Sequence, residues 1–254
     1  MSRLARRSLR GEVLAILGTG VANGSCSLLH AAGIGYGASL ALDLKVRVRI
    51  LDKESKKEID DPDNLLGAIV NSWTSAGHPL PEQLFWSIKS EIPPRQGLKS
   101  SSAISVAAVR ALCDATGINI ENHQIVDIAS NAQLECGVSI TGSIDDTWAA
   151  LEGGWKLIDV NAENAKSGVL LESTGPSSDD WNVILLTGAE RSERPRLEDF
   201  SYHQQAFMQA LSALQEGKDL VALTWNGRGV VGALNNPTIR RLTNDAFVNG
   251  ARAA

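Results

Sequence analysis

One segment near the N-terminus alternates strictly between apolar and basic residues. In residues 44–51 (LKVRVRIL), every second position holds leucine, valine or isoleucine, and Lys45, Arg47 and Arg49 lie between them. Side chains on a β-strand point to opposite faces in turn, so this pattern predicts a strand with one buried and one solvated face. Strands of a purely parallel sheet are covered on both faces. The segment therefore favours an α+β fold.

Size, charge and cysteine content narrow the class of protein. The 254 residues, 43% of them hydrophobic and 21% charged, suffice for one large globular domain or two modest ones. No apolar run is long enough to cross a bilayer, so we expect no membrane partner. A formal net charge of −5 argues against a nucleic-acid partner. Three scattered cysteines without CxxC spacing, and four scattered histidines, fit a cytoplasmic protein without a zinc site.

Periodicity and turn residues predict mixed strands and helices. Strands are expected over residues 13–17, 44–51, 83–92, 155–160 and 181–186. Helices are expected over residues 62–75, 100–116, 121–135, 202–215, 219–234 and 237–248, with Asp61 as the first N-cap. We place a domain boundary after residue 160. It divides the chain into an N-terminal domain over residues 1–160 and a C-terminal domain over residues 161–254.

The most specific local feature lies between an expected strand and an expected helix. Residues 93–103 (PPRQGLKSSSA) combine two prolines, a glycine, a lysine and three consecutive serines. Gly97 allows a tight turn and a close backbone approach to a ligand. The start of the next helix offers free N–H groups to an anion. The serine hydroxyls can bond phosphate oxygens or coordinate Mg²⁺, and Lys99 adds a positive charge, so the segment predicts a phosphate-binding loop.

A plainer interpretation of residues 93–103 is an ordinary capped helix after a proline turn. One serine would suffice for such a cap, so three in succession after Gly-Leu-Lys favour phosphate binding. The segment is not a Walker A motif, because the sequence Gly-Lys-Ser/Thr is absent at the required spacing.

A second feature is acidic and lies in an expected loop, residues 141–146 (TGSIDD). The adjacent carboxylates of Asp145 and Asp146 can orient a substrate hydroxyl and accept its proton. Glu135 ends the preceding helix and is a candidate Mg²⁺ ligand, because this ion prefers one or two carboxylates plus phosphates. Each acid alone fits a solvated surface charge. Together with the serine loop they supply the parts that phosphoryl transfer requires.

These segments resemble a known family. Residues 93–103 look like the central ATP-binding motif of the GHMP kinases, which include galactokinase, homoserine kinase and mevalonate kinase. More narrowly, the chain resembles the archaeal-type shikimate kinases. The segments that carry this resemblance are residues 35–38, 42–44, 90–103, 141–146, 153–154 and 223–227. The resemblance therefore spans most of the chain.

The resemblance implies two α+β halves with the active site between them. It implies ATP and Mg²⁺ as cofactors and the 3-hydroxyl of shikimate as the phosphoryl acceptor. It makes Asp145 the catalytic carboxylate and Asp146 a substrate or structural partner. Mg²⁺ would be held by Ser101 or Ser102 together with Glu135. The implied nucleotide-binding residues are Pro93, Gly97, Leu98, Lys99, Ser100, Ser101, Ser102 and Ala103.

The chain departs from the family in three places. Tyr36 stands where the family commonly has lysine, and residues 1–27 match only loosely. The third glycine-rich motif of the family, and the closing strands of its second half, have no counterpart before residue 254. We therefore expect residues 161–254 to be an incomplete domain. We also expect the chain to be poorly stable or weakly active, because missing strands would leave an apolar sheet edge unpaired.

Two other functions compete with phosphoryl transfer. Residues 18–24 (GTGVANG) imitate a dinucleotide fingerprint after a strand. The basic face of residues 44–51 opposes that fold, and neither Tyr36 nor Tyr202 has the lysine four residues later that short-chain dehydrogenases use. The other alternative is an inactive ligand-binding descendant of a kinase. The missing third motif and Tyr36 favour it, whereas Asp145, Glu135 and the full run of serines argue against it.

The acceptor is the part that the sequence defines least. Shikimate carries a carboxylate, which needs a cation in its binding site. Lys45, Arg47, Arg95 and Arg228 are all candidates, and the sequence leaves the choice open. Another small hydroxyl metabolite, such as homoserine, is the alternative acceptor. The oligomeric state has no signature in the sequence.

Overall fold

An antiparallel sheet of five strands forms the centre of the protein. The computed structural model describes residues 14–55, 57–139, 141–177, 179–186 and 196–254. The strands are β1 (Ile16–Leu29), β2 (Tyr36–Leu51), β3 (Phe85–Ser90), β4 (Trp155–Asp159) and β5 (Val169–Ser173). Their order is β1-β2-β4-β5, and β3 pairs with β2. β2 thus pairs with β1 along nearly all its length, with β3 through residues 46–51 and with β4 through residues 36–38.

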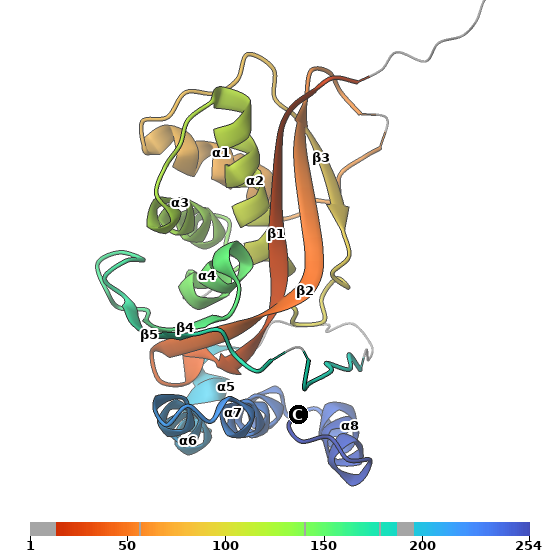
Figure 1. Ribbon diagram of the computed structural model, residues 1–254, viewed down its shortest axis with the longest axis vertical. Coiled ribbons are helices and arrows are strands. Elements are labelled where there is room, and N and C mark those ends of the chain that lie inside the picture. Colours follow the sequence, from red (N-terminus) through yellow and green to blue (C-terminus); the bar gives the residue numbers. More distant parts are fainter. Residues whose placement is uncertain (1–13, 56, 140, 178, 187–195) are drawn as a thin grey trace, which may run out of the picture.

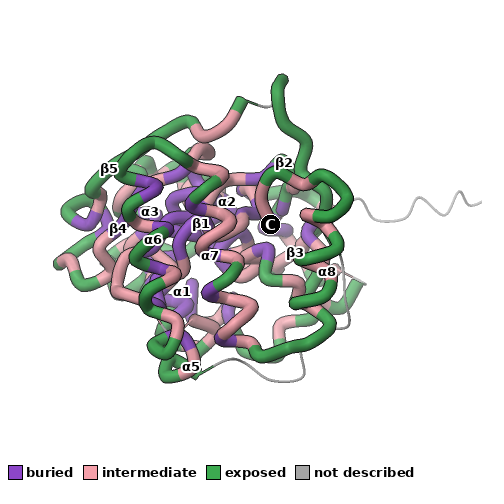
Figure 2. Tube along the Cα trace, turned by 90° about the horizontal axis from the view of Figure 1, so that it is seen from below, coloured by how far each residue is buried: buried purple, intermediate pink, exposed green. Residues whose placement is uncertain are grey.

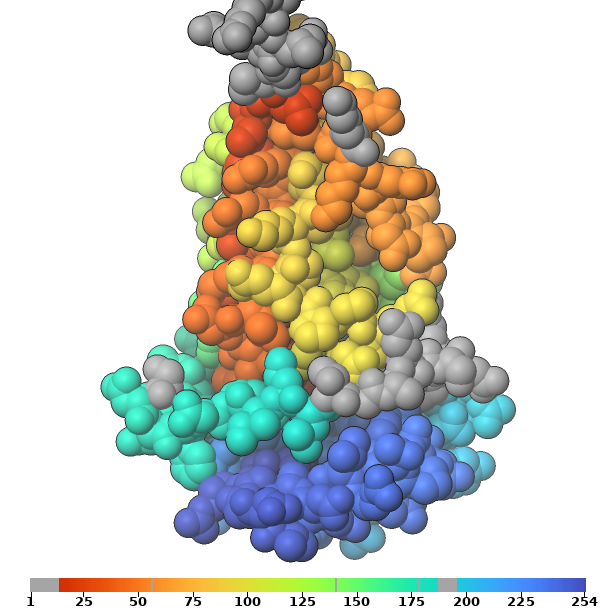
Figure 3. Space-filling view, turned by 90° about the vertical axis from the view of Figure 1, so that its right-hand side faces the viewer, coloured from red at the N-terminus to blue at the C-terminus, as the bar shows by residue number. Residues whose placement is uncertain are grey.

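β2 has the one-sided pattern that its sequence predicts. Val46, Val48 and Ile50 are fully buried, whereas Lys45 and Arg47 are exposed. The basic side faces solvent, and Figure 3 shows the orange and yellow atoms of β2 and β3 at the surface on this side. An antiparallel sheet with one solvated face confirms the expected α+β class.

Four helices cover the other face of the sheet (Figure 1). They are α1 (Leu65–Ser75), α2 (Ser100–Thr116), α3 (Asn122–Glu135) and α4 (Ile144–Glu152). Their apolar sides and the inner face of β1 and β2 form the larger core cluster, which includes the fully buried Trp73. The bounds of α2 agree with the sequence prediction, because Gly117 ends the helix in the left-handed conformation that glycine tolerates.

A second layer of helices lies across one end of the sheet. It consists of α5 (Leu197–Ser201), α6 (Gln204–Gln215), α7 (Asp219–Leu234) and α8 (Pro237–Val248), and Figure 2 shows the molecule from this side. A separate core cluster joins this layer to the ends of β1, β2 and β4, with Phe200 and Phe207 at its centre. The buried Asn226 of α7 ties the layer to β1, because its side chain accepts from the His30 N–H and donates to the Ser27 carbonyl.

The glycine-rich segment after residue 17 is part of a strand, so the strand expected over residues 13–17 ends twelve residues later than the sequence predicts. β1 continues through it to Leu29 and passes directly against α2. A Cβ atom added at Gly18 or Gly20 would overlap the carbonyl oxygens of Ala111 and Ala107. These glycines therefore allow a strand and a helix to approach closely, and they do not form the nucleotide-binding turn of a dinucleotide fingerprint.

Two further local predictions are wrong. Residues 181–186 form no strand, and all six are exposed. Asp61 is not the N-cap of α1, because the helix begins at Leu65. Its carboxylate instead accepts hydrogen bonds from the N–H groups of Leu65 and Leu66, at 2.8 and 2.9 Å. A carboxylate four residues upstream can satisfy these N–H groups as a capping side chain would.

The boundary after residue 160 stays a prediction, although the two sides of it share one sheet. β5 lies beyond that boundary and pairs with β4.

Among the residues that the structure describes, no helix has both the length and the apolar character that a membrane span requires.

The close approach of β1 to α2 can be tested with Gly20→Ala. We expect a loss of about 3 kcal/mol in the free energy of unfolding, because the new methyl group meets the Ala107 carbonyl and the backbone must shift. Urea unfolding measures this. The control is Val21→Ala on the solvated side of the same strand, with an expected cost of about 1 kcal/mol or less. Equal costs at the two positions would contradict the packing argument.

Candidate active site

The expected phosphate-binding loop connects β3 to α2 and is shaped by three left-handed residues. Arg95, Gly97 and Lys99 have φ angles of 56°, 77° and 59°. The loop is fixed to the sheet where the Ser25 N–H donates to the Leu98 carbonyl at 3.3 Å. Lys99 occupies the N-cap position of α2, and its side chain makes no capping hydrogen bond with a residue that the structure describes. The first N–H groups of a helix have no partner within the helix, so an anion at this end of α2 stays a prediction.

The three serines of the loop differ in their surroundings. Ser100 and Ser101 are partly exposed, and neither hydroxyl donates to another residue that the structure describes. Ser102 is buried, and its hydroxyl donates to the side-chain oxygen of Gln133 at 2.9 Å. Ser100 and Ser101 are thus the serines whose hydroxyls could reach a phosphate or a metal ion, while Ser102 joins α2 to α3.

The flanking loop residues have a structural role. Leu98 and Ala103 are buried in the larger core cluster, and Pro93 is partly buried. The side chains of Leu98 and Ala103 anchor the loop, so these two residues could contact a nucleotide only through backbone atoms.

The acid pair lies on a helix, not in the loop that the sequence predicts. Asp145 and Asp146 occupy the first turn of α4, and each is only 3% exposed. The helix starts directly after Ser143, which adopts a left-handed conformation with φ 52°. Carboxylates in the first turn of a helix are stabilised by the partial positive charge of its N-terminus. That interaction offsets only part of the cost of burying two neighbouring acids.

β2 supplies the surface against which the acid pair is packed. The Ser39 hydroxyl, fully buried, lies 3.1 Å from Asp145 Oδ2 and also hydrogen bonds to Asp146 Oδ1. A Cβ atom at Gly37 would lie 2.7 Å from the Asp145 carboxyl carbon. Only glycine at this position leaves room for the carboxylate, which gives a physical reason for the glycine in the segment at residues 35–38.

An ion pair joins the acid pair to the phosphate-binding loop. Lys99 Nζ lies 3.0 Å from Asp146 Oδ2, and the two side chains are 19% and 5% exposed. The structure therefore brings together three parts that are distant in sequence: the loop before α2, the first turn of α4 and the start of β2. They meet between the two core clusters, since Leu42 belongs to one cluster and Ala38 to the other.

Glu135 is not part of this arrangement. Its carboxylate accepts a hydrogen bond from the Asn71 side chain of α1 at 2.8 Å and is exposed. Residues two positions apart on a helix point in nearly opposite directions. The residue of α3 that contacts the loop is accordingly Gln133, which accepts from the Ser102 hydroxyl and donates to the Thr147 hydroxyl at 3.1 Å. The geometry gives no support to Glu135 as a Mg²⁺ ligand.

Burial dominates the proton affinity of Asp145. Loss of hydration, and next the negative charge of Asp146, raise its pKa from 3.8 to about 7. The positive charge of Lys99 and the hydrogen bond from Ser39 oppose this rise. Burial also raises the pKa of the neighbouring Cys26 thiol to about 11. At neutral pH the site thus holds a neutral thiol and a carboxyl group poised to exchange a proton.

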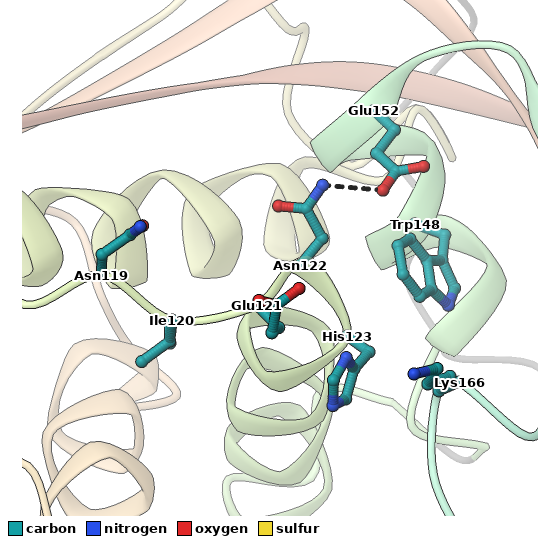
Figure 4. Close-up of a pocket in the computed structure, with 8 residues that line it drawn as sticks. All are labelled: Asn119, Ile120, Glu121, Asn122, His123, Trp148, Glu152 and Lys166. Atoms are coloured by element: carbon teal, nitrogen blue, oxygen red, sulfur yellow. Dashed lines mark hydrogen bonds between the residues drawn. The ribbon is translucent and has the colours of Figure 1, made fainter.

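A separate surface pocket of about 430 Å³ lies between the start of α3, α4 and Lys166 (Figure 4). Trp148 and His123 line it, and Asn122 donates to Glu152 at 2.8 Å across its rim. None of the residues expected to bind nucleotide, metal or acceptor lines this pocket, so it is no part of the candidate active site.

Comparison with known proteins finds relatives among the small-molecule kinases. Residues 64–154 match the model of the GHMP kinases N terminal domain, a span that contains both the serine loop and the acid pair. This segment is a GHMP kinase N-terminal domain. A shikimate kinase of Pyrococcus abyssi is 29% identical over 221 residues, which cover 83% of this chain and 78% of that protein. A shikimate kinase of Halobacterium salinarum is 28% identical over 248 residues, or 89% of this chain and 81% of that one.

The GHMP kinase fold extends beyond this domain. The crystal structure of the Methanococcus jannaschii mevalonate kinase superposes with a TM-score of 0.61 at 16% identity, covering 92% of this chain and 84% of that one. The expected fold class and family are therefore confirmed, and the relatives are small-molecule kinases.

The fit of Asp145 against Gly37 can be tested with Gly37→Ala. The new methyl group must displace the carboxylate, and a displacement near 1 Å can lower turnover by about 10²-fold. ATP affinity, measured by calorimetry, should change little. Thermal unfolding supplies the control: in an Asp145→Ala background the same change should cost less stability, because the carboxylate is gone. An equal cost in both backgrounds would contradict the contact.

The burial of Asp145 also predicts a pH-dependent stability. Because its pKa is higher in the folded protein than in the unfolded chain, the folded state binds more protons between about pH 4 and pH 7. The stability from this group is therefore present at low pH and is lost as the pH rises through about 7. Asp145→Asn should raise the melting temperature at pH 8, and the gain should shrink towards pH 4. A gain independent of pH would refute this account.

Proposed function

We propose that the protein transfers the γ-phosphoryl group of ATP to the 3-hydroxyl of shikimate, in the cytoplasm. The observation that carries this proposal is the buried carboxyl group of Asp145, held beside a loop that leads into the N-terminus of α2 and carries two partly exposed serines. Phosphoryl transfer to an alcohol needs an anion cradle and a group that accepts the proton of the hydroxyl.

The residues divide these tasks between them. The N–H groups at the start of α2, with Ser100 and Ser101, bind the phosphate oxygens of ATP. Asp145 orients the acceptor hydroxyl and takes its proton as the hydroxyl oxygen bonds to the γ-phosphorus. The bond between that phosphorus and the β,γ-bridging oxygen breaks at the same time, and ADP leaves. A pKa of about 7 suits this role, because a base is most effective when its pKa is near the working pH.

A Mg²⁺ ion fits this arrangement in part. Among the residues that the structure describes, no group of three or more histidine, cysteine or acidic side chains could hold a metal by itself. Mg²⁺ commonly takes only one or two protein ligands and completes its shell with phosphates and water. The available Ser101 hydroxyl could provide one such ligand, and Glu135 could not in this conformation. When bound, the ion would neutralise charge on the phosphates.

The acceptor is proposed from the named relatives. Two shikimate kinases match most of this chain at 28–29% identity, whereas the mevalonate kinase superposes at 16%. Homoserine or another small hydroxyl metabolite remains the alternative acceptor within the GHMP kinases.

One experiment separates these possibilities. The purified protein is incubated with Mg-ATP and a mixture of shikimate, homoserine, mevalonate and galactose, and phosphorylated products are identified by mass spectrometry. We expect shikimate phosphate alone. The control is Asp145→Asn, which should abolish turnover but retain ATP binding. Another phosphorylated acceptor would refute shikimate, and no product from any acceptor would favour an inactive ligand-binding descendant.

A further inference from the structure

The proposed function does not specify how the roles of the two acids, Asp145 and Asp146, differ. We propose that Lys99 is a positioning residue that holds Asp146 as an ion-paired carboxylate, so that Asp145 alone in the pair takes up and releases the proton. The resemblance makes Lys99 a nucleotide ligand, whereas the structure bonds it to Asp146. The role in catalysis rests on the proposed function, but the arrangement of charges can be tested without it.

The first argument is the charge balance. Two adjacent carboxyl groups are each 3% exposed, and ionising both in that setting is costly without a cation. The ion pair places Lys99 on Asp146, at 3.0 Å from Oδ2. Asp145 makes no ion pair with another residue that the structure describes. One acid therefore has a fixed counter-charge, and the other does not.

The second argument is the number of protons available for hydrogen bonds. The Ser39 hydroxyl has one proton but contacts a carboxyl oxygen of both acids. It can donate to Asp146 and accept from Asp145 at the same time only if Asp145 carries a proton. When Asp145 is ionised, the two carboxylates compete for the single hydroxyl proton. Both hydrogen bonds of the Ser39 hydroxyl can therefore form at once only when Asp145 is protonated.

The other groups that face the acid pair do not alter the difference in charge environment between Asp145 and Asp146. Gly37 of β2 adds no side chain and closes one side of the Asp145 carboxyl group. Cys26 of β1 lies within electrostatic range of Lys99 and Asp146, and its thiol is neutral because burial raises its pKa to about 11. The start of α4 favours negative charge on both acids alike. Lys99 is therefore the group that makes the two acids unequal.

Separating the two acids has a chemical consequence. Pairs of acids with different environments commonly serve as one proton-transfer group and one fixed charge. Removing the cation should raise the pKa of Asp145, whereas removing the negative charge of Asp146 should lower it. The two substitutions are thus expected to act in opposite directions, although both break the same ion pair.

The test is a titration of Asp145 in the full chain without nucleotide or acceptor. Carbon-13 NMR of aspartate-labelled protein follows its carboxyl resonance, assigned by its loss in Asp145→Asn. We expect a midpoint near pH 7. Lys99→Met should raise the midpoint by about one pH unit or more and Asp146→Asn should lower it similarly, with the double variant between them. Lys99→Arg should retain the original midpoint.

Controls separate this role from simpler ones. Lys89→Met, an exposed lysine on the solvated face of β3, should leave the midpoint unchanged. If Lys99→Met does not fold, Asp146→Asn decides by its direction alone. A midpoint that stays the same in Lys99→Met or Asp146→Asn would overturn the proposal.

Kinetics supply a second readout once an acceptor is known. In a plot of kcat against pH, the midpoint of the acid limb should shift with the NMR midpoint in each variant. The KM for ATP should change little. A raised KM for ATP with an unmoved acid limb would make Lys99 a phosphate ligand and overturn the inference. Because the NMR titration needs no turnover, a failed acceptor assay would refute the proposed function and leave this inference to be decided by the titration.

Discussion

The burial of two adjacent carboxyl groups against the start of β2 is the constraint around which the site is organised. Water is excluded from Asp145 and Asp146, so their charges must be met by the protein itself. The helix N-terminus, the Ser39 hydroxyl and the Lys99 ammonium group each meet part of that need. Each comes from a different part of the chain, so the acid pair can exist only when the sheet, α4 and the loop before α2 are in place.

The antiparallel sheet explains how these parts meet. β2 is long enough to run through both core clusters, and residues 37–39 lie where one cluster gives way to the other. The glycines of β1 let α2 settle closely on the strand, and α2 in turn fixes the loop that carries Lys99. Positions that look unrelated to chemistry thus determine the distance between Lys99 and Asp146.

Sequence periodicity predicted most elements but missed the helix that matters most. α2 is long and ends at a glycine, so its pattern was clear. α4 has nine residues and begins just after Gly142 and Ser143, which are typical of turns, so Asp145 was expected in a loop. Residues 181–186 show the opposite error. Their apolar side chains fit a buried strand, but they form none, and no strand of the described chain pairs with them.

The chemical groups that the site can offer and the class of fold were both predictable from the order of the residues alone. The alternation of residues 44–51 required a sheet with one solvated face, and the serine loop and acid pair were visible as local motifs. Which of these groups meet depends on the fold of the whole chain. It brought Ser39 and Lys99 to the acids and turned Glu135 towards Asn71, because contacts across 47 to 107 residues depend on strand register and helix rotation. Neither of these is encoded in a short stretch of sequence.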